Sequence, residues 1–408
     1  MTIYDTLTLS TIPPIEKPGP TNTGYRLADG EKSLMEWKDH PLYGKAGGSN
    51  NLLESPEFDN VMFNKVRFDR NMKLFANDVT FQDCLFEGSV DWAKDASCDG
   101  TSFGLNIGGD SNEFGSQTSG TLVSHCTFRN LNNGITLTRG PYSSSTPDAF
   151  TTGTIIEYCD IGGGPHPLGG GCIEYGDGLS GIGDRICKDA IKLQRSCIVR
   201  NNWIHDLGYS LACSGSCKPH SDGIQSTTQP GGKLLIQYNN FDMPVTSYGG
   251  GGDYECGCQA NKYTQSNACI LIGAQIAQDS YCTLEIVDNW LNGGNYTLGL
   301  GSGGSYLWRG DITVTGNEFG RDFRNMIRNY SKNDNGEFRD EAYAFNRVGN
   351  TMTDSAVPFP DGDLGRTKDW NRRNCQNFTN DSEGKACPNT KYRENLPCYD
   401  DCDQLLCS

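Results

Sequence analysis

Two aspartates, each with a basic side chain nearby, are the best candidates for chemistry in this chain. Asp189 lies in KDAIKL, three residues before Lys192. Asp222 lies in HSDGIQ, two residues after His220. If these segments stack as neighbouring strands, the two carboxyl groups lie roughly 5 Å apart. A carboxylate pair at that separation is typical of retaining glycoside hydrolysis, with one acid and one nucleophile.

The same residues fit three other roles. With Asn267 adding an amide oxygen, Asp189 and Asp222 form a candidate Ca²⁺ site, although no reaction suggested by the pattern requires a cofactor. A lyase would use a base beside positive charge, for which Lys192, His220 and Arg185 are candidates. The structural alternative is that an aspartate followed by Gly or Ala at a chain reversal binds the amides of the turn.

An internal repeat must position these residues. One apolar segment recurs with its last apolar residue at Phe86, Phe128, Ile161, Ile204, Phe241, Leu291 and Phe319. Two residues earlier, the repeats carry Cys84, Cys126, Cys159, Asn202, Asn239, Asn289 and Asn317. A second segment aligns Asn133, Asp189, Asp222, Asn267, Tyr296 and Asn325. Short β segments at regular recurrence, with long inserts at one fixed place, predict a right-handed parallel β-helix in which coils stack into a continuous core.

This all-β solenoid has four predicted parts. Residues 1–20 form a strand arm and Pro-rich linker, and residues 21–55 form an amino-terminal cap with a helix-like patch around Glu31 to Trp37. Residues 56–350 form the β-helix, and residues 351–408 form a Cys-rich tail. In the arm, the alternation of TIYDTLTLSTI puts Ile3, Leu7 and Leu9 on one side, which is a strand pattern. Such an arm either caps its own β-helix or adds a strand to a neighbouring molecule.

Composition points to the cell exterior. Eighteen Cys in 408 residues favour disulfides across the inserts and an oxidising compartment, and no metal site is predicted from their spacing. The small buried Cys of the repeat are an exception, since they fill the interior slot that Asn fills elsewhere. N-glycosylation sequons begin at Asn295, Asn329, Asn377 and Asn380. A net charge of −16 argues against nucleic acid as a partner, and no apolar run is long enough to span a membrane.

One conflict and one further binding feature remain. The chain starts MTIYDTLTLS, which has no apolar signal core, so either the signal has been removed from this numbering or export follows another route. Trp203 and Trp290 occupy equivalent outward positions two coils apart, where they are candidates for stacking on sugar rings. The alternative is that these indoles pack beneath loops.

Several motifs resemble a known family. The segments HSDGIQ, VRNNWIHDLG, VDNWLNGGNYTLGLG and VTGNEFGRDFR, between Thr121 and Tyr330, look like those of secreted pectate-lyase-like right-handed β-helix proteins. The resemblance implies an extracellular, glycan-associated protein. HSDG is similar to the NTDG-type motif of polygalacturonases, which implies a catalytic role for Asp222. The companion Asp-Asp, Gly-His-Gly and Arg-Ile-Lys motifs are absent, and so is the YG-x-DPH pattern of alginate epimerases.

Two functions follow from these features. The arm, the sequons and the incomplete catalytic motifs favour a secreted, glycosylated structural protein that self-associates into a filament or surface layer. The inserts and the family resemblance favour an extracellular polysaccharide lyase or glycoside hydrolase with a groove near Asp189 and Asp222. Both functions predict contact with glycans, and only the first predicts self-association.

Overall fold

The fold is taken from a computed structural model of the chain. It describes residues 14, 16–27, 30–31, 33–88, 103–108, 118–129, 131, 133–137, 153–162, 189–193, 196–205, 207, 222–226, 232–243, 268–272, 282–293, 296–300, 312–320, 325–329, 350–352, 355–358, 378–380, 386–388, 399–400 and 404–405.

Three long sheets make up the body of the protein. Sheet A contains β1 (Met35–Glu36), β4 (Val66–Phe68), β7 (Leu85–Glu87), β10 (Thr127–Arg129), β13 (Asp160–Gly162), β16 (Trp203–His205), β19 (Asn240–Met243), β22 (Trp290–Gly293), β25 (Glu318–Phe319), β27 (Thr351–Met352) and β28 (Ser355–Pro358). Sheet B contains β2 (Leu52–Glu54), β5 (Met72–Phe75), β8 (Phe103–Ile107), β11 (Asn133–Leu137), β14 (Ile191–Leu193), β17 (Asp222–Ser226), β20 (Ala268–Ile272), β23 (Tyr296–Leu300) and β26 (Asn325–Asn329). Sheet C contains β3 (Met62–Asn64), β6 (Thr80–Gln82), β9 (Leu122–Ser124), β12 (Thr154–Glu157), β15 (Cys197–Arg200), β18 (Gly232–Gln237), β21 (Cys282–Val287) and β24 (Ile312–Thr315).

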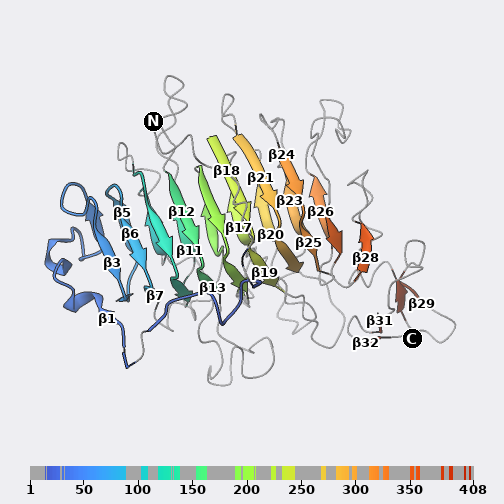
Figure 1. The fold of residues 1–408 in the computed structure, drawn as a ribbon, viewed down its shortest axis with the longest axis horizontal. Coiled ribbons are helices and arrows are strands. Elements are labelled where there is room, and N and C mark those ends of the chain that lie inside the picture. The colour runs from blue at the N-terminus through green and yellow to red at the C-terminus, as the bar shows by residue number, and fades with distance from the viewer. Residues whose placement is uncertain are drawn as a thin grey trace, which may run out of the picture.

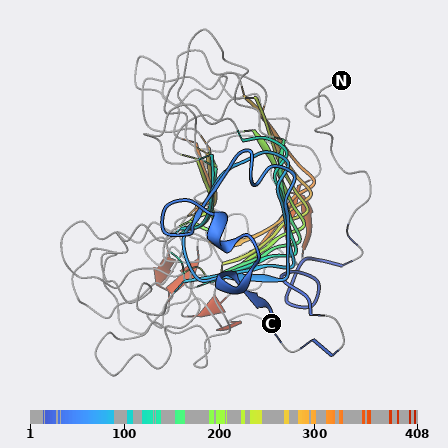
Figure 2. The same cartoon turned by 90° about the vertical axis from the view of Figure 1, so that its left-hand side faces the viewer.

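The chain visits sheets C, A and B in turn, and strands three apart along the chain pair in parallel (Figure 1). Seen along the stack, the strands form walls around a common interior (Figure 2). Parallel crossovers of this kind are right-handed in nearly all proteins. The architecture is therefore the predicted right-handed parallel β-helix. The carboxyl-terminal region adds two small hairpins, β29 (Phe378–Asn380) with β30 (Ala386–Pro388), and β31 (Tyr399–Asp400) with β32 (Gln404–Leu405).

The strand register confirms the first repeat segment. Its aligned apolar residues pair in an unbroken series from Phe86 to Phe319. The predicted alignment of the second segment is confirmed for Asn133, Asp189 and Asp222. The alignment of Asn267 with Asp222 was wrong by one residue. Asp222 pairs with Ala268, not with Asn267, which lies outside the described residues. Because Cys269 to Ile272 are all apolar, this strand lacks the alternation that would have fixed its register.

A two-residue turn joins sheet C to sheet A in successive coils. Its first residue has φ of 51° to 57° where it is not glycine, and this left-handed conformation turns the chain sharply. The residues at this first position are Asp83, His125, Tyr158, Asn201, Tyr238, Asp288 and Gly316. The second residue is the predicted Cys or Asn of the repeat, and Asn350 continues the series. We call this series the corner ladder.

Asn239 shows how the Asn part of the corner ladder is bonded. Its Nδ2 donates to the carbonyl oxygens of Val199 (2.9 Å) and Gln237 (3.1 Å) and to Asn289 Oδ1 (3.0 Å). Its Oδ1 accepts from the backbone N–H (3.1 Å) and the Nδ2 (2.9 Å) of Asn202. One buried side chain therefore joins three coils, which is the structural role predicted for these residues.

The Cys part of the ladder is packed differently. Cys84, Cys126 and Cys159 are buried free thiols, as predicted from their place in the repeat. The Cys126 thiol donates weakly to backbone oxygens at 3.4 and 3.5 Å. Cys197 and Cys269 are also buried, and neither forms a disulfide within the described part of the chain. Disulfides across the inserts stay a prediction, because the inserts lie outside the described residues.

An aromatic column fills the interior at the amino-terminal end. Phe86 stacks on Phe128 with ring centroids 4.6 Å apart, and Phe68 stacks on Phe86 at 4.8 Å. Trp37 packs on Phe63 and Phe68, and its Nε1 donates to the Asn50 carbonyl (2.7 Å). These contacts seal the core against solvent at this end.

The prediction of a helix-like patch around Glu31 to Trp37 was wrong. Met35 and Glu36 form β1, because they pair with Val66 and Arg67 of β4. Two short 3₁₀ helices follow, η2 (Trp37–Asp39) and η3 (Tyr43–Lys45). Pairing with another strand has overridden the local helical preference, as tertiary context often does.

Candidate functional site

Asp189 and Asp222 lie on successive coils of sheet B, as the sequence predicts. The backbone N–H of Asp222 donates to Asp189 Oδ1 (3.2 Å), and that of Asp189 donates to Asn133 Oδ1 (3.2 Å). Gln225 Nε2 donates to Asp222 Oδ2 (2.8 Å). The three residues Asn133, Asp189 and Asp222 thus form a second ladder, at the start of the sheet B strands.

Burial limits what this pair can do. Asp189 is 3% exposed and Asp222 is 0% exposed, so neither carboxylate is open to a substrate in this conformation. Carboxyl groups that bind backbone amides in this way stabilise chain reversals, which is the structural role considered from the sequence. Their catalytic role stays a prediction, as does that of His220, which lies outside the described residues.

Beside this pair, an outward row of sheet B carries polar side chains. Lys192 is half-buried and lies in register between Thr136 and Gln225. Thr136 is only 4% exposed, and its hydroxyl has no hydrogen-bond partner among the residues that the structure describes. A buried hydroxyl without a partner loses free energy unless a ligand or a water supplies one. The sequence alignment placed Thr136 and Lys192 in this row but gave no sign of the unpaired hydroxyl.

Trp203 and Trp290 lie two coils apart on the outer side of sheet A, in the predicted register. The Trp203 ring stacks on His205, with centroids 3.4 Å apart, and His205 Nε2 lies 2.7 Å from Asp160 Oδ1. The ring of Trp290 has the ammonium of Lys17 at 5.8 Å from its centroid. Both indoles are half-buried and in contact with their own chain, so their binding to sugar stays a prediction.

A feature that the sequence did not reveal lies along sheet A. Residues 16–27, here called the strap, run along the outside of the stack from the late coils towards the early ones (Figure 1). At the late coils, Asn240 Nδ2 of β19 donates to the Pro18 carbonyl (2.8 Å), and Lys17 reaches Trp290 of β22. The Pro-rich linker is therefore docked on the body of the protein.

The middle of the strap is fixed by backbone contacts. The N–H of Gly24 donates to the Tyr158 carbonyl (2.9 Å), and the N–H of Tyr25 donates to Thr127 Oγ1 (3.2 Å). Gly24 has φ of +78°, and a Cβ there would lie 2.7 Å from Thr127 Oγ1 and 2.9 Å from Asp160 Cβ. Only glycine fits this close approach.

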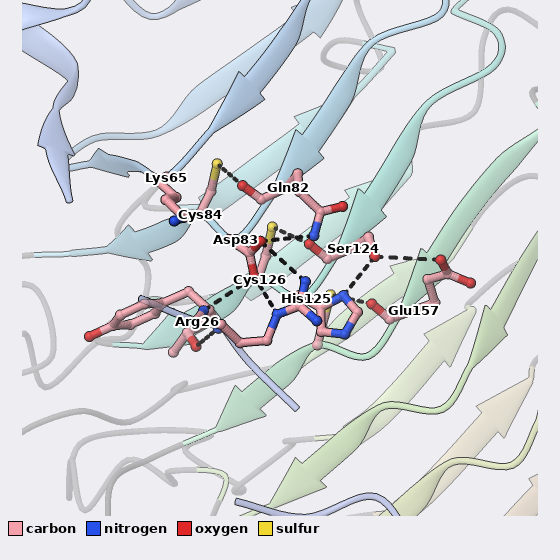
Figure 3. Close-up of polar contacts among 12 residues, drawn as sticks. Arg26, Lys65, Gln82, Asp83, Cys84, Ser124, His125, Cys126 and Glu157 are labelled. Atoms are coloured by element: carbon pink, nitrogen blue, oxygen red, sulfur yellow. Dashed lines mark hydrogen bonds and ion pairs between the residues drawn. The ribbon is translucent and has the colours of Figure 1, made fainter. Parts of the chain in front are cut away.

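At the early coils, Arg26 holds the strap to the turn before β7 (Figure 3). Its Nε and its backbone N–H both donate to Asp83 Oδ1, at 2.8 and 3.2 Å. Burial opposes ionisation of Asp83, but the bonds from Arg26 and Gln82 hold the pKa of that carboxyl below its ordinary value. We call this contact the latch.

His125 lies next to the latch in the following turn. Its ring stacks on Tyr158 (4.8 Å between centroids), and its Nδ1 lies 3.0 Å from Ser124 Oγ (Figure 3). Desolvation, and then the charge of Arg26, lower the pKa of His125, although Asp83 and Glu157 act in the opposite direction. Tyr158 and Arg26 come from another coil and from the strap, so the sequence around His125 does not reveal these neighbours.

The remaining predicted residues are only partly covered. Asn329 ends β26 and Asn380 ends β29, whereas Asn295 and Asn377 lie outside the described residues. Ile3, Leu7 and Leu9 of the arm also lie outside them. Among the residues that are described, no group of three or more His, Cys, Asp or Glu side chains could hold a metal ion. Ca²⁺ at Asp189 and Asp222 stays a prediction.

Comparison with protein-family models, with curated proteins and with solved structures finds no match for this chain. Within the described part of the chain, no helix has the length and apolar character needed to cross a membrane. The geometry and the sequence are therefore the grounds for a functional proposal.

Proposed function

We propose that this chain is a secreted, glycosylated structural protein of the pectate-lyase-like β-helix type, which assembles end to end through its amino-terminal arm. The observation that carries the proposal is the path of the strap. Its contacts run from Asp83 before β7 to Trp290 in β22, so the chain that precedes Lys17 is delivered to the late coils. An arm that only capped the first coils would not need this route.

The length of the arm supports the same conclusion. The 13 residues before Pro14 span roughly 40 Å if extended, whereas β22 and β27 are separated by two strand spacings, about 10 Å. The arm is therefore long enough to pass the last coil and contact another molecule. Its alternating sequence suits strand addition, in which backbone hydrogen bonds give affinity.

The two ladders suit a structural role as well. Asp189 Oδ1 accepts the backbone N–H of Asp222 on the next coil, and the corner ladder joins coils as far as Asn350. A solenoid with such cross-links is a stiff rod whose ends are its natural contact surfaces. The sequons and the sequence resemblance support an extracellular setting in which the rod meets glycans.

Arm variants test this proposal. Ile3→Ser, Leu7→Ser and Leu9→Ser together should abolish assembly, as should deletion of residues 1–12. The matched control is Thr2→Ser, Thr6→Ser and Thr8→Ser, on the opposite side of the arm, which should assemble like the wild type. Sedimentation velocity reports the particle size. Equal assembly of both triple variants would overturn the proposal.

One observation favours a second function, an extracellular polysaccharide lyase or hydrolase. The unpartnered Thr136 hydroxyl lies beside Lys192, which would attract an acidic sugar. If this row binds substrate, Thr136→Val and Lys192→Met should each weaken binding and cleavage of acidic polysaccharides at least tenfold, about 1.4 kcal/mol. Lys233→Met, in sheet C, is the control. Wild-type turnover in both sheet B variants would exclude this function for the row.

A further inference from the structure

The amino-terminal end of the rod carries three exposed apolar side chains. In the described part of the chain, the large hydrophobic residues that are clearly exposed are Leu27 (39%), Met35 (47%) and Met62 (63%). Leu27 ends the strap, Met35 lies on β1, and Met62 lies on β3. All three belong to the first coils, whereas a soluble protein would scatter such residues over its surface.

The same end leaves strand edges without a partner strand. In the described residues, β1 pairs only with β4, and β3 pairs only with β6. The edge of β2 is different, because Gly47 and Leu52 exchange backbone hydrogen bonds of 2.9 and 3.3 Å across it. Unpaired edges are templates for a strand from another chain unless charges or prolines block them.

Of the two open edges, β3 has less protection. Glu36 of β1 forms an ion pair with Arg67, so charge lies along that edge. By contrast, β3 reads Met62-Phe63-Asn64, with no charge and no proline, and its outward Met62 is the most exposed of the three apolar residues. Charged side chains are the usual means by which an edge avoids pairing, and β3 lacks them.

We propose that the open edge of β3, marked by Met62, is the acceptor for the arm of a second copy of this chain. The inference rests on the proposed function and adds the surface on which the arm docks. The arm leaves the strap at the late coils of one rod, and the acceptor lies at the first coils of the next. In this arrangement the arm runs beside β3 at the ~4.8 Å spacing of paired strands, and one of Ile3, Leu7 and Leu9 lies next to Met62.

The two surfaces differ, so the contact is heterologous and does not close on itself. Each rod offers one arm at one end and one β3 edge at the other. A repeated head-to-tail contact of this kind gives an open filament, not a closed dimer. The proposal therefore predicts the polarity of the assembly as well as its contact residues.

Met62→Asp is the direct test, because Met62 is largely exposed and its replacement leaves the core intact. It should raise the concentration at half-assembly at least tenfold, about 1.4 kcal/mol. Thr283→Asp, which adds the same charge on β21 of the same sheet, should assemble like the wild type. Equal assembly of Met62→Asp and the wild type would overturn the β3 acceptor while leaving arm-driven assembly intact.

Photo-crosslinking identifies the occupant directly. A benzoylphenylalanine at position 62 of the full chain should crosslink to residues 1–12. Mixing ¹⁵N-labelled and unlabelled protein distinguishes copies, and mixed-isotope crosslinks are expected. Crosslinks within one copy only, or to peptides outside the arm, would contradict the proposal. If the wild type and the arm-deleted chain have the same particle size, the proposed function itself fails.

Discussion

The early and late coils stabilise the same corner by different means. In the early coils, Cys84, Cys126 and Cys159 fill the ladder position with small thiols that make only long contacts to backbone oxygens. In the late coils, Asn side chains from Asn202 to Asn350 join successive coils through bonds of about 3 Å, within the normal hydrogen-bond range. The corner therefore accepts either a small apolar group or a fully bonded amide.

Other contacts differ along the same division. The early coils contain the stacked phenylalanines and the latch between Arg26 and Asp83. Ile161 ends this row in the early coils, and Ile204, Phe241, Leu291 and Phe319 continue it in the late coils. Stacked aromatic rings and the latch therefore support the early coils, whereas buried side-chain hydrogen bonds at the corner support the late coils.

The largest effect is expected in the late coils. Asn239→Leu removes donors to Val199 and Gln237 and leaves the N–H groups of Asn202 without their acceptor. Because these polar groups stay buried, the free energy of unfolding should fall by about 3–5 kcal/mol. Urea denaturation followed by circular dichroism measures the loss. Asn239→Asp keeps the acceptor and should lose less, and equal losses would contradict this bonding scheme.

The border between the two halves gives the next prediction. Cys159→Asn should extend the Asn ladder by one coil, because the thiol already faces the carbonyls of Val123 and Glu157 and its N–H donates to Asn202 Oδ1. The expected change in unfolding free energy is between 0 and about 1 kcal/mol of stabilisation. Cys159→Leu is the oversized control, which should destabilise by about 1–3 kcal/mol. Equal destabilisation by Asn would show that the slot in the early coils cannot hold an amide.

The latch should make strap docking sensitive to acid. The pKa of His125 is lowered in the folded protein. Neutral His125 therefore contributes its full share to the stability of the folded protein above the unfolded pKa of 6.5, and that share is lost as pH falls through the lowered pKa. The pKa of Asp83 is also lowered, so its contribution is lost only below 3.8. The protection of residues 17–27 against hydrogen exchange, relative to the intrinsic exchange rate at each pH, should therefore fall first below pH 6.5 and again below 3.8.

Variants separate these two steps. His125→Gln should remove the first step, whereas Asp83→Asn should raise exchange in the strap at every pH above 3.8. Because Arg26 is more than half exposed, the loss in Asp83→Asn should be at most about 1 kcal/mol. If neither variant changes exchange in the strap, the backbone hydrogen bonds of Gly24 and Tyr25 are sufficient to hold the strap in place.

The smallest effect concerns the thiols. Burial raises the pKa of Cys126 well above its ordinary value, and burial raises that of Cys269 likewise. Neither should react with iodoacetamide at pH 8 in the native protein, and both should react after unfolding in urea. Peptide mass spectrometry measures the labelling. Labelling of native Cys126 would show that the early coils open more readily than the aromatic column suggests.

The fold was predictable because the same types of side chain recur at equivalent positions of each coil. The register was set by the apolar residue that ends each segment and by the Cys or Asn two residues earlier. The predicted register was wrong only at Cys269 to Ile272, where a continuous apolar run hides the alternation. The placement of Asp189 beside Asp222 followed from the same alignment. The burial of Asp189 and Asp222 did not follow from the alignment, because burial depends on packing across the whole coil.

The strap could not be predicted for a different reason. Its contacts use the Pro18 carbonyl and the N–H groups of Gly24 and Tyr25, and backbone groups leave no trace in sequence. Arg26 with Asp83 and Lys17 with Trp290 are contacts between side chains, but the first pair alone is separated by 57 positions. The docking of an extended segment on distant coils can therefore be recognised only from the three-dimensional structure.

The most direct test of end-to-end assembly is the mass and shape of the native particle, measured by light scattering and negative-stain imaging on one sample. Arm-driven assembly predicts a mass that grows with protein concentration and filaments whose width matches a single rod. A compact monomer, or a small closed oligomer of constant mass, would contradict it. The polar row beside Thr136 and Lys192 would then become the leading candidate for function.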